Sequence, residues 1–202
     1  MGLIRTAAPE ALPVSLDELK LHARVDTDDF DDDLTLKLEA TVRHVEEITR
    51  RALITQEWKL SLPRFPFGGR EIVLPKGSLQ AVGEITYLDL DGERQTLDEE
   101  AYAVGASTEP ALVVPAYMTT WPAARIFRDS VQITFTCGFG DAADDVPADL
   151  RHAIVLFAGW AFQGVESDQS LGGTDTARER AFKALIAKWV LRSDEVAELI
   201  VA

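Results

Sequence analysis

The sequence predicts an α+β fold, a helical bundle of about four helices with an inserted β-rich lobe between helices two and three. Apolar residues recur at three- and four-residue steps near both ends of the chain, and they alternate with polar residues in the middle. A chain of 202 residues suits one domain with a real core. We therefore expect a single domain over 1–202, with helical parts at about 15–53 and 146–202 and a β-rich insertion at about 54–140.

Two helices are expected before the insertion. Ser15-Leu-Asp-Glu18 has the form of a capping box and predicts a helix that runs to about Val25. A second helix is predicted from about Asp32 to Ala52, because one stripe of it is apolar: Leu34, Leu38, Val42, Val45 and Ile48.

The β-rich region begins at about Ile54, where Trp58, Leu60 and Leu62 alternate with polar residues. Segments 85–90 and 93–97 predict a hairpin, since Asp91-Gly92 between them suits a tight primed turn with positive φ values. Further short strands are expected at 72–74, 102–104, 112–114 and 131–137.

Helix returns at Val146-Pro147, where a proline fits the first helical turn. A polar loop is expected from Gln163 to Thr174. The last helix has an apolar stripe, and a final turn or two capped by Ser193 follows it; the stripe consists of Phe182, Leu185, Ile186, Trp189 and Val190.

Composition argues against several function classes. The formal charge of -14, from 20 basic and 34 acidic residues, opposes a surface that grips DNA, because nonspecific affinity for nucleic acid comes from cations. Cys137 is the only cysteine, so neither an intrachain disulfide nor a cysteine-based zinc site can form. Neither a signal peptide nor an apolar run long enough for a bilayer is recognisable, so we expect a soluble protein with no membrane partner.

Six aspartates lie between Asp26 and Asp33 and raise the question of a cation site. An EF-hand register starting at Asp26 puts Asp31 where glycine is required and Lys37 where the bidentate glutamate belongs. The first turn of the second helix offers the aspartates another role, because carboxylates there cap N–H groups and meet the positive end of the helix dipole. The run is interpreted as a helix corner and not as a metal site.

No catalytic, cofactor-binding or metal-binding residues are predicted. Gly138-Phe-Gly140-Asp-Ala-Ala143 matches a dinucleotide fingerprint, but its aspartates would repel phosphate and Pro147 delays the helix that should hold it. The three histidines, His22, His44 and His152, fall one to each of three predicted helices and lack the spacing of a ligand pair. We expect a protein that is not an enzyme.

Two regions have the composition of a contact surface. The apolar ending Leu199-Ile-Val-Ala202 and the nearby Trp189 either complete the core or dock elsewhere; this makes Trp189, Leu199, Ile200 and Val201 candidate interface residues. Turn-rich segments in the β-rich region add the aromatic candidates Phe67, Tyr117 and Trp121, for which the alternative is a place over the core of that region.

The order of several short blocks resembles the head-tail connector (adaptor) family of long-tailed bacteriophages, prophages and phage-derived gene transfer agents. The resemblance covers about residues 12 to 165. The blocks follow one another in the order of that family: Pro13-Val-Ser-Leu16, His22-Ala-Arg-Val-Asp26, Arg51-Ala-Leu-Ile-Thr-Gln56 with Trp58, Arg64-Phe-Pro66, Ile85-Thr-Tyr-Leu-Asp89 with Asp91-Gly92, and Val146-Pro-Ala-Asp-Leu150. The last forty residues match less clearly.

The resemblance implies a structural, non-enzymatic protein that forms a ring of about twelve copies beneath the portal. Such a ring would join the portal protein to a stopper or tail-completion protein and leave a channel through which double-stranded DNA passes without specific binding. Its place would be the head-tail junction of a virion or phage-like particle, after assembly in the bacterial cytoplasm. The alternative from another class is a small acidic assembly chaperone or binding module that the finished particle does not retain.

Overall fold

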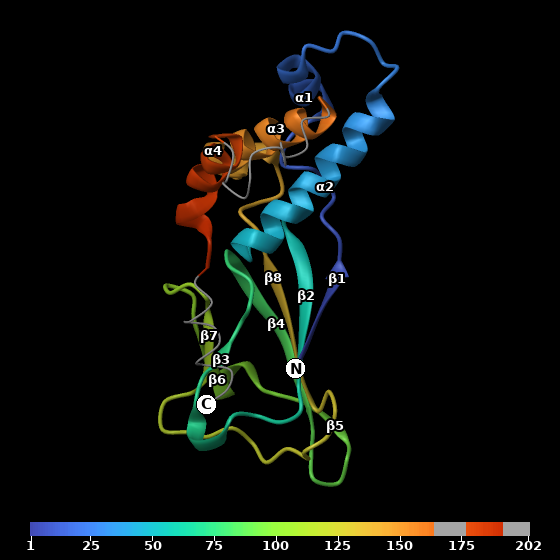
Figure 1. Ribbon diagram of the computed structural model, residues 1–202. Helices are drawn as coiled ribbons and strands as arrows, with labels where there is room; N and C mark the ends of the chain where they lie inside the picture. The colour runs from blue at the N-terminus through green and yellow to red at the C-terminus, as the bar shows by residue number, and fades with distance from the viewer. Residues whose placement is uncertain (164–176, 192–202) are drawn as a thin grey trace, which may run out of the picture. The chain divides into compact units, whose positions relative to one another are not determined.

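The computed structural model describes residues 1–163 and 177–191. It divides the chain into two compact units. The β unit consists of residues 1–9 and 55–138 together with Leu191, and the helical unit consists of residues 10–54, 139–163 and 177–190 (Figure 1).

The helical unit holds four α-helices and two short 3-10 turns. The helices are α1 (Leu16–Ala23), α2 (Asp31–Thr49), α3 (Ala148–Phe162) and α4 (Ala177–Ile186), with η3 at Ala143–Asp145 and η4 at Ala187–Trp189. The capping box of α1 is confirmed: Ser15 Oγ accepts from Glu18 N at 3.1 Å, and Ser15 N donates to the Glu18 carboxylate at 2.8 Å. None of the helices in the described part of the chain has the length and apolar character that a bilayer span requires.

One hydrophobic core joins these helices. The apolar stripe of α2 is buried as predicted at Leu34, Leu38, Val42 and Val45. These side chains pack with Leu19 of α1, with Leu150 and Ile154 of α3, and with Phe182 and Ile186 of α4. Helix α3 is packed against the other three helices, so it forms the centre of the unit.

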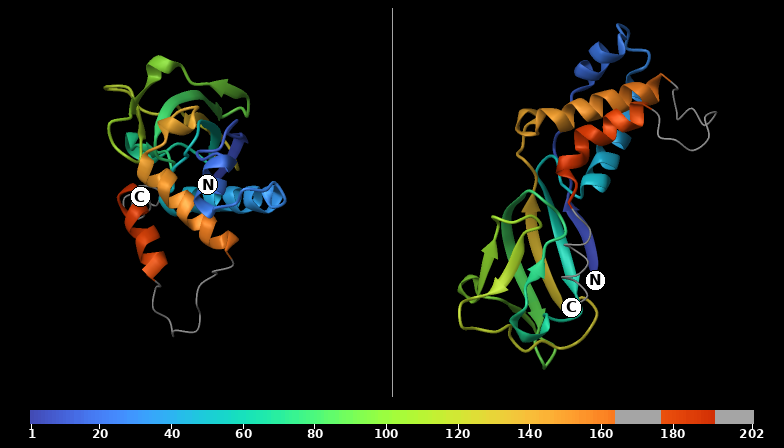
Figure 2. Two further views of the ribbon diagram at one scale, coloured as in Figure 1. Left: turned by 90° about the horizontal axis from the view of Figure 1, so that it is seen from above. Right: turned by 60° about the vertical axis from the view of Figure 1, so that its left-hand side comes forward.

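The β unit contains two antiparallel sheets (Figure 2). The first has five strands in the order β1-β2-β8-β4-β5, with β1 Gly2–Ala7, β2 Gln56–Leu62, β8 Val131–Cys137, β4 Leu79–Leu88 and β5 Arg94–Thr96. The second has three strands in the order β3-β7-β6, with β3 Ile72–Val73, β7 Leu112–Pro115 and β6 Tyr102–Gly105. Two 3-10 turns, η1 (Phe67–Gly69) and η2 (Glu99–Ala101), lie in the connections.

The core of the β unit is centred on β8. Strand β8 pairs with β2 on one side and with β4 on the other, and its side chains alternate between buried and half-buried. The alternation leaves Val131, Ile133, Phe135 and Cys137 fully buried. This pattern is what a strand inside a sheet with one covered face requires.

The β-rich part is not made of the insertion alone, which corrects the predicted arrangement. Strand β1 comes from residues 2–7, before the first helix, and pairs with β2 through registers such as Leu3 opposite Leu60. Its side chains are exposed except at half-buried Leu3, so it has no buried face whose apolar alternation the sequence would reveal.

Three local predictions also differ from the structure. Between β4 and β5 only Gly92 has a positive φ, and the Asp89 side chain accepts from Asp91 N and Glu93 N, so the loop is longer than a two-residue primed turn. Pro147 precedes α3 as its N-cap residue and does not lie in the first turn. Val190 is exposed after η4 and does not share the apolar stripe of α4.

Candidate interaction surfaces

The histidines and the cysteine, which were considered as possible metal-binding or catalytic residues, do not lie together in one site. His22 lies against Gly159 of α3, His44 stacks on Phe157 with ring centroids 5.4 Å apart, and His152 is exposed. Cys137 is buried in β8. Within residues 1–163 and 177–191 no group of three His, Cys, Asp or Glu side chains is placed to hold a metal ion.

The glycine-rich segment after β8 is filled by the protein itself. A Cβ on Gly140 would collide with the Asp145 side chain, whose Oδ2 accepts from Ala142 N at 2.9 Å. A carboxylate therefore occupies the space beside the glycine where a dinucleotide would need its pyrophosphate. The segment that matches the dinucleotide fingerprint is therefore a turn that the Asp145 side chain closes.

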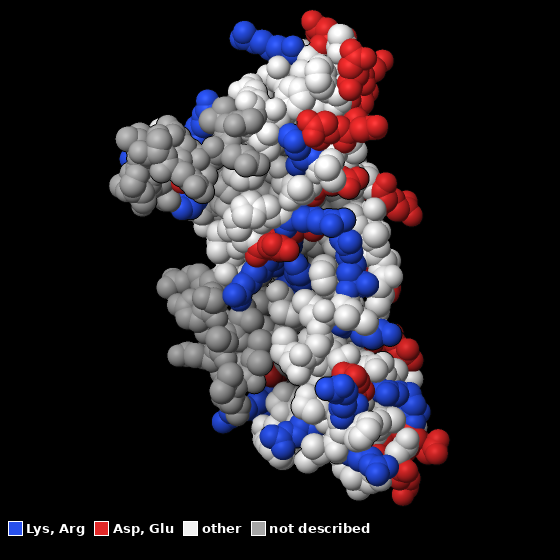
Figure 3. All heavy atoms as spheres, turned by 45° about the vertical axis from the view of Figure 1, so that its right-hand side comes forward, with Lys and Arg blue, Asp and Glu red and all other residues white. Residues whose placement is uncertain are grey.

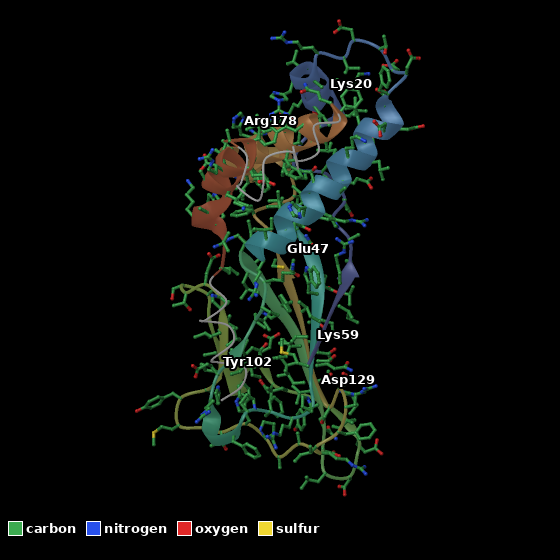
Figure 4. The ribbon with its side chains drawn as sticks, viewed as in Figure 1. Lys20, Glu47, Lys59, Tyr102, Asp129 and Arg178 are labelled. Carbon is green, nitrogen blue, oxygen red and sulfur yellow. The ribbon has the colours of Figure 1, made fainter. Side chains whose placement is uncertain are left out.

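The aspartate run forms the acidic corner, defined as residues 26–33, between α1 and α2 (Figure 3). Lys20 of α1 donates to Asp28 at 2.6 Å and to Asp31 at 2.7 Å, and Lys37 donates to Asp33 at 2.7 Å. Figure 4 shows Lys20 beside this loop. The pKa of Lys20 is raised, first by its hydrogen bond to Asp28 and then by the one to Asp31. The hydrogen bond between Lys20 and Asp28 also lowers the pKa of Asp28.

Two roles were expected of the acidic corner, facing the positive end of the α2 dipole and capping α2, and the structure agrees with only the first. Asp31, Asp32 and Asp33 occupy the first turn of α2, where their charge faces the positive end of the helix dipole. The prediction that a carboxylate caps the helix is wrong, because the N-cap residue is Phe30 and no side chain caps α2. Phe30 instead contacts Phe162 of α3 edge-on, with ring centroids 5.6 Å apart.

Trp189 is packed against other side chains of the helical unit. It is half-buried, and its ring meets Phe139 edge-on at 5.5 Å. Arg51 donates to the Trp189 carbonyl oxygen at 2.6 Å and lies over the indole at 5.7 Å. These contacts fix the end of η4 to the unit. The other three candidates at this end, Leu199, Ile200 and Val201, lie outside the described residues.

The aromatic candidates of the β unit differ in exposure. Phe67 is 67% exposed and carries the Arg64 guanidinium 4.0 Å from its ring centre, and Tyr117 is 92% exposed. Trp121 is buried: it stacks on Phe65 at 5.0 Å, and its Nε1 donates to the Arg70 carbonyl oxygen at 2.9 Å. Trp121 thus holds the loop that exposes Tyr117.

Several exposed apolar side chains were missed by the sequence reasoning. In the β unit they include Leu90, Ile126 and Phe127, which lie in connections where no period marks them. In the helical unit Leu36 is exposed on α2, and its position two residues from both Leu34 and Leu38 could have revealed this. Residues two apart on a helix do not share a face.

No protein-family model matches this chain, and no curated protein does. Solved structures do match it. The neck of an empty GTA particle, computed with C6 symmetry, contains a chain with 24% identity and a TM-score of 0.76, covering 95% of this chain and 97% of that one.

Two further structures match at the same coverage of 95% and 97%. They are the virion of a native gene transfer agent (GTA) particle, with 24% identity and a TM-score of 0.74, and the neck of a native GTA particle computed with C12 symmetry, with 23% identity and a TM-score of 0.75. This chain therefore shares its fold, over almost its whole length, with chains of gene transfer agent particles.

Proposed function

We propose that this chain is a head-tail connector, or adaptor, in the neck of a phage-like particle. About twelve copies form a ring beneath the portal protein, join it to a stopper or tail-completion protein, and leave a channel for double-stranded DNA. The observation that carries the proposal is the shared fold with chains of GTA necks, which extends over 95% of this chain. The order of the sequence blocks supports the same assignment independently.

The chemistry of the described residues is compatible with a structural role. Some of their ionisable groups form local ion pairs, such as Lys20 with Asp28 and Lys188 with Asp149. The net charge of -14 would keep DNA from adhering to a surface that it must pass. The acidic corner, whose aspartates are exposed apart from half-buried Asp31, is a candidate for a lumen-facing or solvent-facing surface.

The contact residues of the proposed ring follow from the two apolar regions. The C-terminal segment with Leu199, Ile200 and Val201 docks on the portal, and Trp189 anchors the point from which this segment leaves the helical unit. In the β unit Phe67 and Tyr117 are the contact side chains, and Trp121 supports their loops from inside.

Incorporation into particles tests the function. A tagged copy of the chain is expressed in the bacterium that produces the particle, and purified particles are imaged with a label against the tag. A connector is expected at the head-tail junction, and deletion of its gene should leave DNA-filled heads without tails. A chaperone would be absent from finished particles, and that outcome would replace the proposed function with the alternative.

Deletion of residues 193–202 tests the portal contact separately. Because the shortened chain keeps every residue that the structure describes, it should fold with an unchanged circular dichroism spectrum and melting temperature. Binding to the cognate portal ring, measured by co-sedimentation, should fall at least about tenfold. The matched control replaces the exposed Leu21 with serine, leaves the end of the chain intact, and should bind the portal as the unchanged chain does. Unchanged portal binding by the shortened chain would contradict the docking role.

A further inference from the structure

Helix α2 presents an apolar side chain to solvent at the centre of its outer face. Leu36 is 66% exposed, whereas Leu34 and Leu38 on either side of it are fully buried. Ala40 is exposed one turn further on. We define the outer face of α2 by its exposed residues, which carry three carboxylates and one guanidinium: Asp32, Leu36, Glu39, Ala40, Arg43 and Glu47.

Helix α4 presents a face of the complementary kind. Phe182 and Ile186 turn into the core, and the opposite side of the helix is exposed. We define the outer face of α4 by Ala177, Arg180, Ala181, Lys183 and Ala184. Because the alanine side chains are short, the middle of this face does not protrude. Arg180 and Lys183 give the face positive charge.

The two outer faces fit each other in shape and charge. Small residues let two helix axes approach to about 8–10 Å, so the alanines of α4 leave room for a protruding leucine such as Leu36. The net negative outer face of α2 would then lie beside the cations of α4, an arrangement that favours correct pairing and suppresses like-with-like contacts.

The contact cannot form within one copy. Both helices turn their buried residues into the same core, and beside it the exposed His44 of α2 stacks with Phe182 of α4 at 6.1 Å. The outer faces defined above consist of exposed residues, so they lie on the sides of the two helices that are turned from this core. Figure 4 labels Glu47 on α2 and Arg178 on α4.

We propose that the outer face of α2 in one copy docks on the outer face of α4 in a second copy of this chain. The inference deepens the proposed function, on which it rests, by naming the faces that join neighbours in the ring. Because the two faces differ, the contact is head-to-tail, and repetition closes into a ring when the rotation permits. Residues 26–31 of the acidic corner precede the outer face of α2 and stay outside the contact.

Complementary charge reversal tests the pairing. One variant carries Glu39→Lys with Glu47→Lys, so that both of its outer faces are positive. The other carries Arg180→Glu with Lys183→Glu, so that both are negative. Each variant alone should assemble at least about tenfold more weakly than the unchanged chain, because only like charges can meet. An equimolar mixture should recover the assembly, with the two variants alternating.

Native mass spectrometry over a range of concentrations measures the size and the variant composition of the assemblies. Rings or chains that contain equal numbers of the two variants support the proposal, because alternation requires this pair of faces. Assembly of each variant by itself at the level of the unchanged chain overturns it and leaves the proposed function standing, since the ring would then use other faces.

The apolar centre of the contact is tested with a matched pair. Leu36→Asp should abolish assembly, whereas Leu21→Asp on α1, at a position 82% exposed and outside both faces, should not. Equal effects of the two substitutions contradict the proposal, and melting temperatures confirm that both variants fold. An unchanged chain that remains a monomer at every concentration also overturns it, while incorporation into particles decides the proposed function separately.

Discussion

At the scale of single residues, the close packing of α1 on α3 depends on Gly159. A Cβ placed there would lie 3.0 Å from His22 Cδ2, closer than ordinary packing allows. The exposed His22 side chain can move only by giving up its place over α3. Glycine inside a helix otherwise costs about 1 kcal/mol relative to alanine, so its presence in α3 has a packing reason.

A double-mutant cycle should separate these two contributions. In a His22→Ala background, Gly159→Ala should raise the free energy of unfolding by about 1 kcal/mol, because helix propensity improves and the clash is gone. In the unchanged background the gain should shrink or reverse, with a coupling of roughly 0.5–2 kcal/mol. Urea unfolding followed by circular dichroism measures all four variants. Additive effects would show that the contact carries no energy.

The ion pair of Lys20 with Asp28 predicts a small pH dependence. The pKa of Asp28 is lowered from its ordinary 3.8, mainly by the hydrogen bond from Lys20. A carboxyl with a lowered pKa stabilises the folded state above its ordinary pKa, and the contribution disappears as the pH falls through the folded-state value. The effect is small because the Asp28 side chain is fully accessible to screening water and salt.

Asp28→Asn should therefore lower the urea midpoint slightly at neutral pH and leave it unchanged in acid below that window. Asp29→Asn is the matched control, because Asp29 lies in the same run and has no ion pair among the described residues. An equal loss for both variants would mean that the total charge of the corner, and not this pair, sets the effect.

At the scale of elements, the two units differ in how much of them could be predicted from sequence. The start of α1 and the approximate extent of α2 follow from local signals, the Ser15 capping box and a stripe of leucines and valines, although both helices end two or three residues before the predicted positions. The pairing of β2 with β8 joins segments about seventy residues apart in sequence, and no local period encodes it. Strand β1 was missed because its partner supplies its hydrogen bonds while its side chains remain mostly in water.

Strand position should set the rate of amide hydrogen exchange. Strand β8 is paired on both sides and buries every second side chain, whereas all three residues of the edge strand β5 are exposed. Amides of β8 should exchange at least about a hundredfold more slowly than those of β5, because they open only with the core. Mass spectrometry of peptides from both strands compares them in one sample. Equal protection would show that the sheet opens as a single unit.

At the scale of the whole molecule, the sequence indicated the class of protein more clearly than it indicated which surface residues are exposed for contacts. The order of the blocks resembles a family of structural proteins of phage-like particles, and this chain shares its fold with chains of GTA particles. The candidate surface was predicted only in part. Tyr117 is exposed, but Trp121 is buried, because the residue type of an aromatic does not reveal which side of a loop it occupies.

Net charge gives the last prediction. Each copy carries a formal charge of -14, so a ring multiplies a field that repels phosphate. The chain should not bind a fluorescent DNA duplex in anisotropy titrations even at about 50 mM salt, where electrostatic affinity is strongest. The absence of binding should hold for monomer and ring alike, since closure adds no cations. Binding that weakens steeply with salt would reveal a cationic surface strong enough to override the total charge. A channel wall of that kind would hold the DNA that the proposed connector has to let pass.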